Sequence, residues 1–347
     1  MSGAALLAVD GGATKTDLAL VSADGALLAL ERGPLSSPDY LGLEGSLDVL
    51  ADLLERAASG AGLPTDDGPV SELGQLLIAG LDLPSEVESF HAAVGARGWS
   101  TRTVVDNDTF AILRAGTEQG WGVAVVCGTG INCVGVAPDG RHARFPALGA
   151  ITGDWGGGYD VGSEALFVAA RSEDGRGPRT SLEQAVPRHF GLDSPRRLAE
   201  ELHAHRISHR RLIELAPVVF AEADRDAAAA AIVERLAAEV VALARVALTR
   251  LGLERQPCEV VLGGGLLRAG DERLQAAIVA GLREVSDEIA VHTTDAPPVV
   301  GAALLGLDWL GADDGAKDRA RRELIAAADA DDDLEPVRPV GMEARRG

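Results

Sequence analysis

The sequence predicts an α/β protein built from two similar units with a cleft between them. The first observation is an apolar run ending in Asp10, followed by a glycine-rich bend over residues 11–16, a second apolar run and the turn Asp24-Gly25. This order is typical of a β-hairpin. The second observation is that the same order returns over residues 122–140. A recurring supersecondary unit indicates a duplicated architecture.

Composition limits the classes of function. The chain has 347 residues, 46% of them hydrophobic but only 3% aromatic, which is enough apolar material for two cores filled mainly by small aliphatic side chains. Its formal net charge is -21. This charge argues against nucleic-acid partners and against anionic membrane surfaces, because phosphate neutralisation needs a basic face. A single nucleotide can still be held by local backbone donors.

Cysteine usage and the N-terminal residues predict a soluble, cytoplasmic protein. Cys127, Cys133 and Cys258 have no CxxC spacing, so we expect three reduced thiols rather than a disulfide scaffold or a zinc site. The apolar run from Leu6 is too short for a signal peptide, and no apolar stretch reaches transmembrane length.

The first third of the chain has the element order βββαβαβα, which is typical of the α/β class. After the first hairpin we expect a third strand over 25–31 and a loop over 33–42. The remaining predictions are helices over 43–58, 85–97 and 109–115 and strands over 75–81 and 101–105.

The second unit begins near residue 117. Its expected elements are hairpins over 121–148, a helix over 160–170, a helical insertion over about 171–216, one long helix over 217–251, a strand over 258–265, a helix over 272–283, a strand over 289–293 and a helix over 297–310. We therefore divide the chain into 1–116, 117–310 and a charged tail, 311–347, that we expect to be irregular and partly disordered.

The two glycine bends are candidate phosphate-binding loops. In the first, Gly11 and Gly12 allow positive φ and close backbone approach, and Thr14, Lys15 and Thr16 supply donors. In the second, Gly128, Thr129 and Gly130 occupy the corresponding place. Two such bends facing each other could hold a nucleoside triphosphate, and Asp10 is suited to a hydrated Mg²⁺. The alternative is a pair of plain hairpins with polar turns.

Asp108 is the candidate general base. It follows an apolar strand and begins a helix, and catalytic groups are commonly presented at strand ends of α/β sheets. A carboxylate there could accept the proton of an attacking hydroxyl during phosphoryl transfer. The alternative role for Asp106, Asn107 or Asp108 is capping the helix. We expect one of the three to cap and Asp108 to be the base.

Two further glycine clusters have a ligand interpretation and a structural one. Gly263, Gly264 and Gly265 suit the close approach of a purine, or else form an ordinary strand-to-helix turn. Asp154, within the cluster 153–158, could bind a substrate hydroxyl or cap a helix, and Trp155 is expected in the core.

Four motifs in this order resemble those of the BadF/BadG/BcrA/BcrD ATPase family, and within it the N-acetylglucosamine kinase branch of the actin–hexokinase–Hsp70 superfamily. They are Asp10–Thr16, Asn107-Asp108-Thr109, Cys127–Cys133 and Val260–Gly265, and the likeness covers roughly residues 5–310. The resemblance implies two ribonuclease-H-like (actin-like ATPase) domains with ATP and Mg²⁺ in the cleft, closure on sugar binding, and an often dimeric protein.

The resemblance also implies roles for individual residues. Asp108 would be the base, Thr14 and Thr129 would lie near the phosphates, and Gly264 near the adenosine. The candidate sugar-binding residues are Ser36, Ser37, Asp39, Asp82, Asn107, Asp108, Asn132, Leu148, Gly149 and Asp154. Two departures bear on the sugar: Trp155 replaces a glutamate of the family motif, and Ser37-Pro38-Asp39 lacks an asparagine and a tryptophan that resemble an acetamido-binding pair.

The function predicted first is an ATP-dependent kinase of an amino sugar or related hexose. One alternative of the same fold is an ATP-driven activator of a partner enzyme, which would need a cysteine pair for an iron–sulfur cluster. The other is a sugar-sensing regulator, which would need a DNA-binding helix pair.

Overall fold

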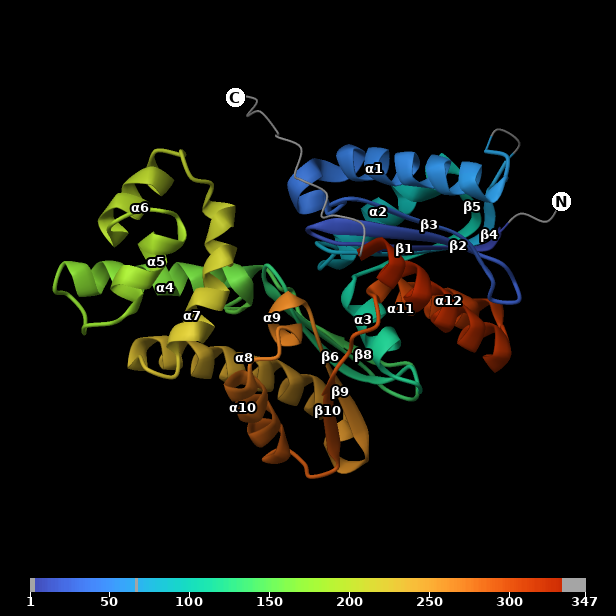
Figure 1. The fold of residues 1–347 in the computed structure, drawn as a ribbon. Helices are drawn as coiled ribbons and strands as arrows, with labels where there is room; N and C mark the ends of the chain where they lie inside the picture. Colours follow the sequence, from blue (N-terminus) through green and yellow to red (C-terminus); the bar gives the residue numbers. More distant parts are fainter. Residues whose placement is uncertain (1–3, 66–67, 333–347) are drawn as a thin grey trace.

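The computed structural model describes residues 4–65 and 68–332, and it has an α/β fold with two five-stranded sheets (Figure 1). In the first sheet the strand order is β3-β2-β1-β4-β5. Strands β1 to β3 are antiparallel, whereas β4 and β5 run parallel to β1. The bounds are β1 Ala4–Gly11, β2 Lys15–Val21, β3 Leu27–Pro34, β4 Ser71–Ile78 and β5 Ser100–Asp106.

The second sheet repeats this topology with the order β10-β9-β6-β7-β8. Its first three strands in sequence are again antiparallel neighbours, and its last two are again parallel to the first of them. The bounds are β6 Gly122–Cys127, β7 Ile131–Val136, β8 His142–Arg144, β9 Cys258–Gly263 and β10 Ile289–Thr293. The duplication expected from the two glycine hairpins is therefore confirmed at the level of topology.

Each sheet is covered by helices on both faces. In the first unit α1 (Pro38–Ala61) and α2 (Pro84–Arg97) cover one face, with Phe90 among the fully buried side chains. In the second unit α8 (Ala227–Leu251) and α10 (Glu272–Arg283) cover one face. The other two faces point toward the centre of the molecule, where further helices lie between the sheets (Figure 1).

At this centre the two units exchange helices. Helix α3 (Thr109–Gly116) follows β5 of the first sheet, yet its residues Ile112 and Leu113 share a core with the second sheet. Helix α11 (Pro298–Leu310) follows β10 of the second sheet, yet it packs on β1 and β4 of the first sheet. A Cβ added at Gly301 would lie 1.8 Å from the carbonyl oxygen of Ala111, so α3 and α11 cross in backbone contact.

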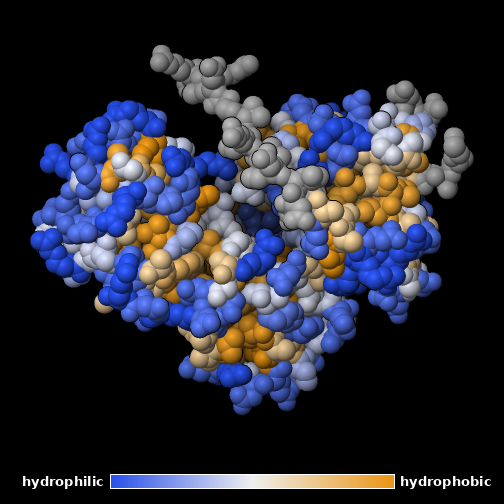
Figure 2. Space-filling view, viewed as in Figure 1, coloured by the Kyte–Doolittle hydropathy of each residue, from blue (hydrophilic) through white to orange (hydrophobic). Residues whose placement is uncertain are grey.

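A helical segment lies between β8 and α8. It comprises η1 (Gly149–Ile151), α4 (Gly157–Glu173), α5 (Leu182–His189), α6 (Pro195–His203), η2 (His209–Leu215) and α7 (Ala216–Glu222). The short elements η3 (Leu253–Arg255) and α9 (Gly265–Arg268) follow α8 and β9. The space-filling view is hollowed between this helical segment and the first unit (Figure 2).

Two helix predictions differ from the structure. The bounds of α1 begin at Pro38, inside the expected loop, because a short helical turn starting at Pro38 precedes the expected helix, with a kink at Gly42, whose φ of 67° is not helical. The expected single helix over 217–251 is two helices. The Asp226 carboxylate accepts from the N–H groups of Ala228 and Ala229, so a new helix begins there.

The tail also differs from the sequence prediction. Residues 314–332 form helix α12 (Asp314–Asp332), although we expected irregular chain beyond Gly311. Its apolar stripe consists of Ala316, Ala320, Leu324 and Ala328, one residue every turn, all buried. Helices α11 and α12 both pack against strands of the first sheet. Residues 333–347, the remainder of the expected disordered segment, lie outside the described residues.

Candidate functional site

The first glycine bend is held by close backbone contacts. The Gly12 N–H donates to the Lys15 carbonyl over 2.9 Å. A Cβ on Gly12 would lie 2.7 Å from that oxygen, and one on Gly11 would lie 2.6 Å from the Ser36 Oγ. Neither glycine has a positive φ, contrary to one of the two reasons for which we expected glycine. Close approach is the reason that holds.

The polar side chains of this bend have different surroundings. The Thr14 residue is exposed at the tip. The Lys15 Nζ lies 3.4 Å from Asp17, which is buried and also bonded to Arg32. The Thr16 hydroxyl donates to the Ser36 Oγ over 2.8 Å, and both side chains are buried. Thr14 is therefore the hydroxyl of this bend that is free to meet a ligand.

Asp10 fits a magnesium ion. Its carboxyl is buried at the end of β1, and in the described part of the chain no side chain or backbone group forms a hydrogen bond with it. Burial, followed by the charges of Asp108 and Asp17, raises the pKa of Asp10 well above its ordinary value. No cluster of three metal-ligating side chains exists among the described residues. One carboxylate plus phosphate oxygens and water is, however, a usual magnesium environment.

The second bend has free space on one side and is held by backbone hydrogen bonds on the other. A Cβ on Gly128 or Gly130 would meet nothing within 4 Å, so there is free space beside this backbone. From the other side the N–H groups of Gly158 and Tyr159, at the start of α4, donate to the carbonyls of Gly128 and Thr129 over 2.8 and 3.0 Å. A Cβ on Gly157 would lie 2.4 Å from Gly130. The glycine cluster 156–158 therefore lets α4 approach the bend.

The polar run after β5 divides its roles between neighbours. The Asn107 Oδ1 accepts from the N–H and the hydroxyl of Thr109, over 3.0 and 2.6 Å, at the start of α3, whose N-cap residue is Asp108. Asp106 accepts from Arg144 over 2.6 Å. The Asp108 carboxylate makes no side-chain cap. Burial raises its pKa to about 6, opposed by the N–H groups of Thr109 and Asp108.

Three amide and carboxyl side chains join the two units next to Asp108. The Asp82 Oδ1 accepts from the Nδ2 groups of Asn107 and Asn132, over 2.9 and 2.8 Å. Asn132 lies on β7 of the second sheet, whereas the other two belong to the first unit. Burial, and after it the charge of Asp108, raises the pKa of Asp82 to about 7.

The residues from Ser36 to Asp39, called the acceptor loop below, lie against the end of β4 and include the first residues of α1. A Cβ on Gly80, with φ 84°, would lie 2.6 Å from an Asp39 carboxylate oxygen and 2.8 Å from the Ser37 Oγ. Burial and the charge of Glu86 raise the pKa of Asp39. The Asp39 charge in turn contributes to the raised pKa of Asp82, so the acceptor loop and the Asp82 network are neighbours.

The remaining candidates fall into two groups. Gly264 has φ 86°, and a Cβ there would lie 2.3 Å from the Cys127 carbonyl. Gly263 packs on Ile112, whereas a Cβ on Gly265 would meet nothing within 4 Å. Leu148, Gly149 and Asp154 form a separate loop, in which the Asp154 N–H donates to Gly149 over 2.9 Å and the Asp154 side chain accepts from Thr152. No hydrogen bond among the described residues joins this loop to Asp82, Asn107 or Asn132.

Trp155 packs against the core of the second unit, as expected, and stacks with Arg235 at 4.0 Å. Two other residues were missed by sequence reasoning. Arg144 donates to Asp106 and to the Leu81 carbonyl, over 2.6 and 3.0 Å, across the two units. The Glu86 carboxylate accepts from the N–H groups of Asp82 and Leu83 and so fixes the Asp82 loop. A glutamate in the first turn of a helix could have indicated the second contact, whereas nothing local indicates the first.

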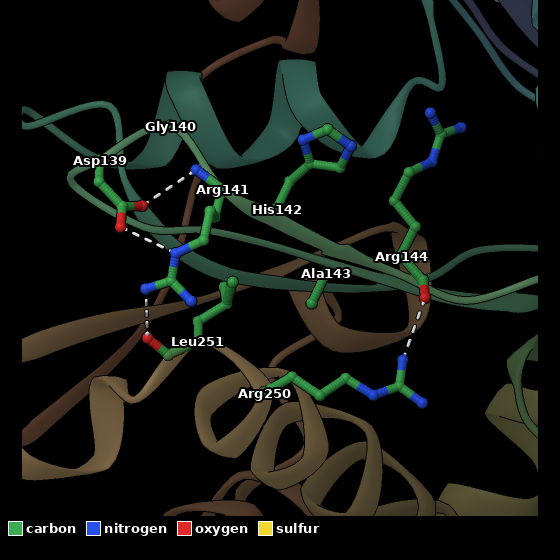
Figure 3. Close-up of a pocket in the computed structure, with 8 residues that line it drawn as sticks. All are labelled: Asp139, Gly140, Arg141, His142, Ala143, Arg144, Arg250 and Leu251. Carbon is green, nitrogen blue, oxygen red and sulfur yellow. Dashed lines mark hydrogen bonds and ion pairs between the residues drawn. The ribbon is translucent and has the colours of Figure 1, made fainter.

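One pocket of the structure lies away from these residues. It has a volume of about 710 Å³ and is lined by residues 139–144 together with Arg250 and Leu251 (Figure 3). Figure 3 shows the Arg144 side chain leading away from Arg250, which donates to the Arg144 carbonyl over 3.3 Å. None of the predicted site residues lines it.

Comparisons place this arrangement in a class. Two like units, with a glycine bend after the first strand of each and helices exchanged at the centre, define an actin-like ATPase fold. The sequence model of the BadF/BadG/BcrA/BcrD ATPase family matches residues 7–306, and the chain belongs to this family.

Three relatives are similar over most of the chain. An N-acetylmuramic acid/N-acetylglucosamine kinase of Clostridium acetobutylicum is 26% identical over 76% of this chain and 85% of its own length. An N-acetyl-D-glucosamine kinase of Dictyostelium discoideum is 27% identical over 89% of this chain and 99% of its own length. A solved structure from Chromobacterium violaceum, described as a candidate N-acetylglucosamine kinase, has a TM-score of 0.71 and 26% identity, covering 88% of this chain and all of that one.

Within the described residues, no helix is both long and apolar enough to cross a membrane.

Proposed function

We propose that this chain is an ATP-dependent sugar kinase that transfers the γ-phosphate of ATP to a hydroxyl of an amino sugar or related hexose. The observation that carries the proposal is the difference between the contacts of Asn107 and those of Asp108, which follow β5. Asn107 accepts from Thr109, whereas the Asp108 carboxylate makes no side-chain cap and interacts with the N–H groups of Thr109 and Asp108, at the strand end where the two units meet. The kinase relatives named above support the reaction class.

Asp108 would act as the general base. A pKa of about 6 leaves the carboxylate mostly ionised at pH 7, yet basic enough to accept a proton from a hydroxyl as that hydroxyl attacks the phosphate. Asp82, held by Asn107 and Asn132, would orient the sugar by accepting from one of its hydroxyls. The acceptor loop beside Gly80 would contact the same ring.

The two glycine bends would hold the triphosphate. The exposed Thr14 hydroxyl and the open space over Gly128 and Gly130 suit phosphate oxygens. Gly265, with open space above it, would lie beneath the adenosine. Asp10 would hold Mg²⁺, which when bound neutralises part of the phosphate charge. We further propose that the protein is cytoplasmic and a homodimer.

The activator alternative receives no support from the cysteines. All three are buried, and burial raises the pKa of the Cys127 and Cys258 thiols to about 12. Such thiols are poor ligands for a cluster shared between subunits.

The test is ATP consumption against a panel of hexoses, amino sugars and N-acetylated sugars, comparing wild type with Asp108→Asn. We expect one group of sugars to stimulate turnover and the variant to lose at least about a hundredfold in kcat, the usual contribution of a positioned base. The variant should melt no lower than wild type at pH 8, because burial disfavours the ionised carboxylate that it removes. Slow hydrolysis indifferent to every sugar would reject the kinase.

A further inference from the structure

Arg210 is the arginine of the helical segment that reaches the first unit. Its Nη2 donates to the Ala13 carbonyl over 3.4 Å, within the first glycine bend. Its guanidinium carbon also lies 4.1 Å from the centre of the Tyr40 ring. Tyr40 follows the acceptor loop directly. One side chain of the second unit thus contacts the first glycine bend and the residue that directly follows the acceptor loop.

The neighbours of Arg210 are engaged differently. Arg211 is bonded to Glu214 over 2.7 Å and stacks on Phe190, and Arg206 is bonded to Glu201. Arg210 has no carboxylate partner within residues 4–65 and 68–332, in a chain whose net charge is -21. The Arg210 guanidinium therefore binds the Ala13 carbonyl and the face of the Tyr40 ring instead of a carboxylate.

The position of Arg210 is fixed by the second glycine bend. Helix α4 begins with the hydrogen bonds to Gly128 and Thr129 described above. Further along the same helix, a Cβ on Gly162 would lie 1.8 Å from the Leu212 carbonyl of η2, so α4 and η2 touch backbone to backbone. Arg210 lies on η2. The sequence of contacts is continuous from the second bend through α4 and η2 to Arg210 and the first bend.

We propose that Arg210 is a positioning residue that fastens the cleft in its closed form, with Ala13 and the Tyr40 ring as its two attachment points. The proposal rests on the kinase function above, since closure matters where two substrates must be enclosed. The structure already has Arg210 on Ala13 and Tyr40, so these contacts stabilise this arrangement of the two units, and Tyr40 connects them to the adjoining acceptor loop. Loss of the contact between Arg210 and Tyr40 therefore disfavours the closed cleft and leaves the proposed base, Asp108, unchanged.

The experiment measures closure and turnover in the same set of variants. Spin labels at the exposed positions Ser59→Cys, on α1, and His203→Cys, on α6, report the distance between the units, while the native cysteines are buried. Closure is induced with a non-hydrolysable ATP analogue, with and without the best sugar from the panel. The variants are Arg210→Ala, Tyr40→Leu, their combination, the conservative Tyr40→Phe, and Arg211→Ala as the matched control.

We expect Arg210→Ala and Tyr40→Leu each to lower the closed-to-open ratio and kcat/KM by about tenfold, from the loss of a cation–π contact and one hydrogen bond. The double variant should lose little more than either single one, and Tyr40→Phe and Arg211→Ala should behave as wild type. Undiminished closure in Arg210→Ala would overturn the proposal while leaving the kinase intact, and so would a loss in Arg211→Ala of the same size. If no sugar is phosphorylated, the distance measurement with the ATP analogue still decides whether Arg210 fastens the cleft.

Discussion

Gly301→Ala tests the crossing of α3 and α11, where the two units exchange helices. An ideal Cβ at this position would lie 1.8 Å from the Ala111 carbonyl oxygen and 2.9 Å from the Ala115 nitrogen. Ordinary contacts of a Cβ begin at about 3.4 Å, so the two helix backbones must separate by more than an ångström. Both obstacles are backbone atoms, which a rotamer change cannot move.

The expected cost is at least that of overpacking a core, about 1–3 kcal/mol. The matched control is Gly95→Ala in α2, a helix-interior glycine with nothing within 4 Å of an added Cβ. That substitution should stabilise by about 0.5–1 kcal/mol, because alanine is the better helix former. The same chemical change thus has opposite signs at two positions.

Differential scanning calorimetry of the two variants and wild type measures the difference, supported by urea titrations followed by circular dichroism. Gly301→Ala should melt several degrees below wild type, and Gly95→Ala at or above it. Gly301→Ala should also alter closure of the cleft, because the crossing lies between the units. A Gly301→Ala protein as stable as Gly95→Ala would refute the backbone contact.

Three further outcomes are expected. The value of kcat/KM should fall about tenfold per pH unit below pH 6, because Asp108 becomes protonated there. Protonation of Asp82 should move the start of this decline toward pH 7. A pH profile that is flat down to pH 5 would contradict this assignment. Asp10→Asn should raise the Mg²⁺ concentration needed for half-maximal turnover while leaving nucleotide binding without metal unchanged, as isothermal titration would show. Leu324→Ala should destabilise the fold by about 2–5 kcal/mol in chemical denaturation, a loss not expected if α12 were loosely attached.

Much of the fold could be predicted because its signals are local. Glycine bends between apolar runs predicted both hairpins, and polar residues at strand ends made Asp10 and Asp108 candidate site residues. The four-residue spacing of Ala316, Ala320, Leu324 and Ala328 was also local, but the surrounding charges obscured it. The break before α8 depended on a single cap at Asp226.

The rest depended on contacts between distant parts of the chain. Arg144 and Arg210 have no motif around them, and their partners lie 38 and 197 residues away in sequence. The different hydrogen bonds of Asn107 and Asp108 could not be predicted, since both residue types are good caps. The placement of α11 on the first sheet could not be predicted either, because a buried apolar helix carries no indication of which sheet it will cover.

The exchange of α3 and α11 has a consequence for how such a molecule arose. Two units of the same topology, each placing the helix after its fifth strand against the other's sheet, have the geometry of an isologous pair. A single-unit ancestor could have made the same contacts as a symmetric homodimer, with gene fusion later joining the copies. Either half of the present chain expressed alone would lack the helix that the other half supplies. The first half, for example, would lack α11, which covers Leu6 and Leu73 of its sheet. Complementary fragments produced together should therefore fold where each alone does not.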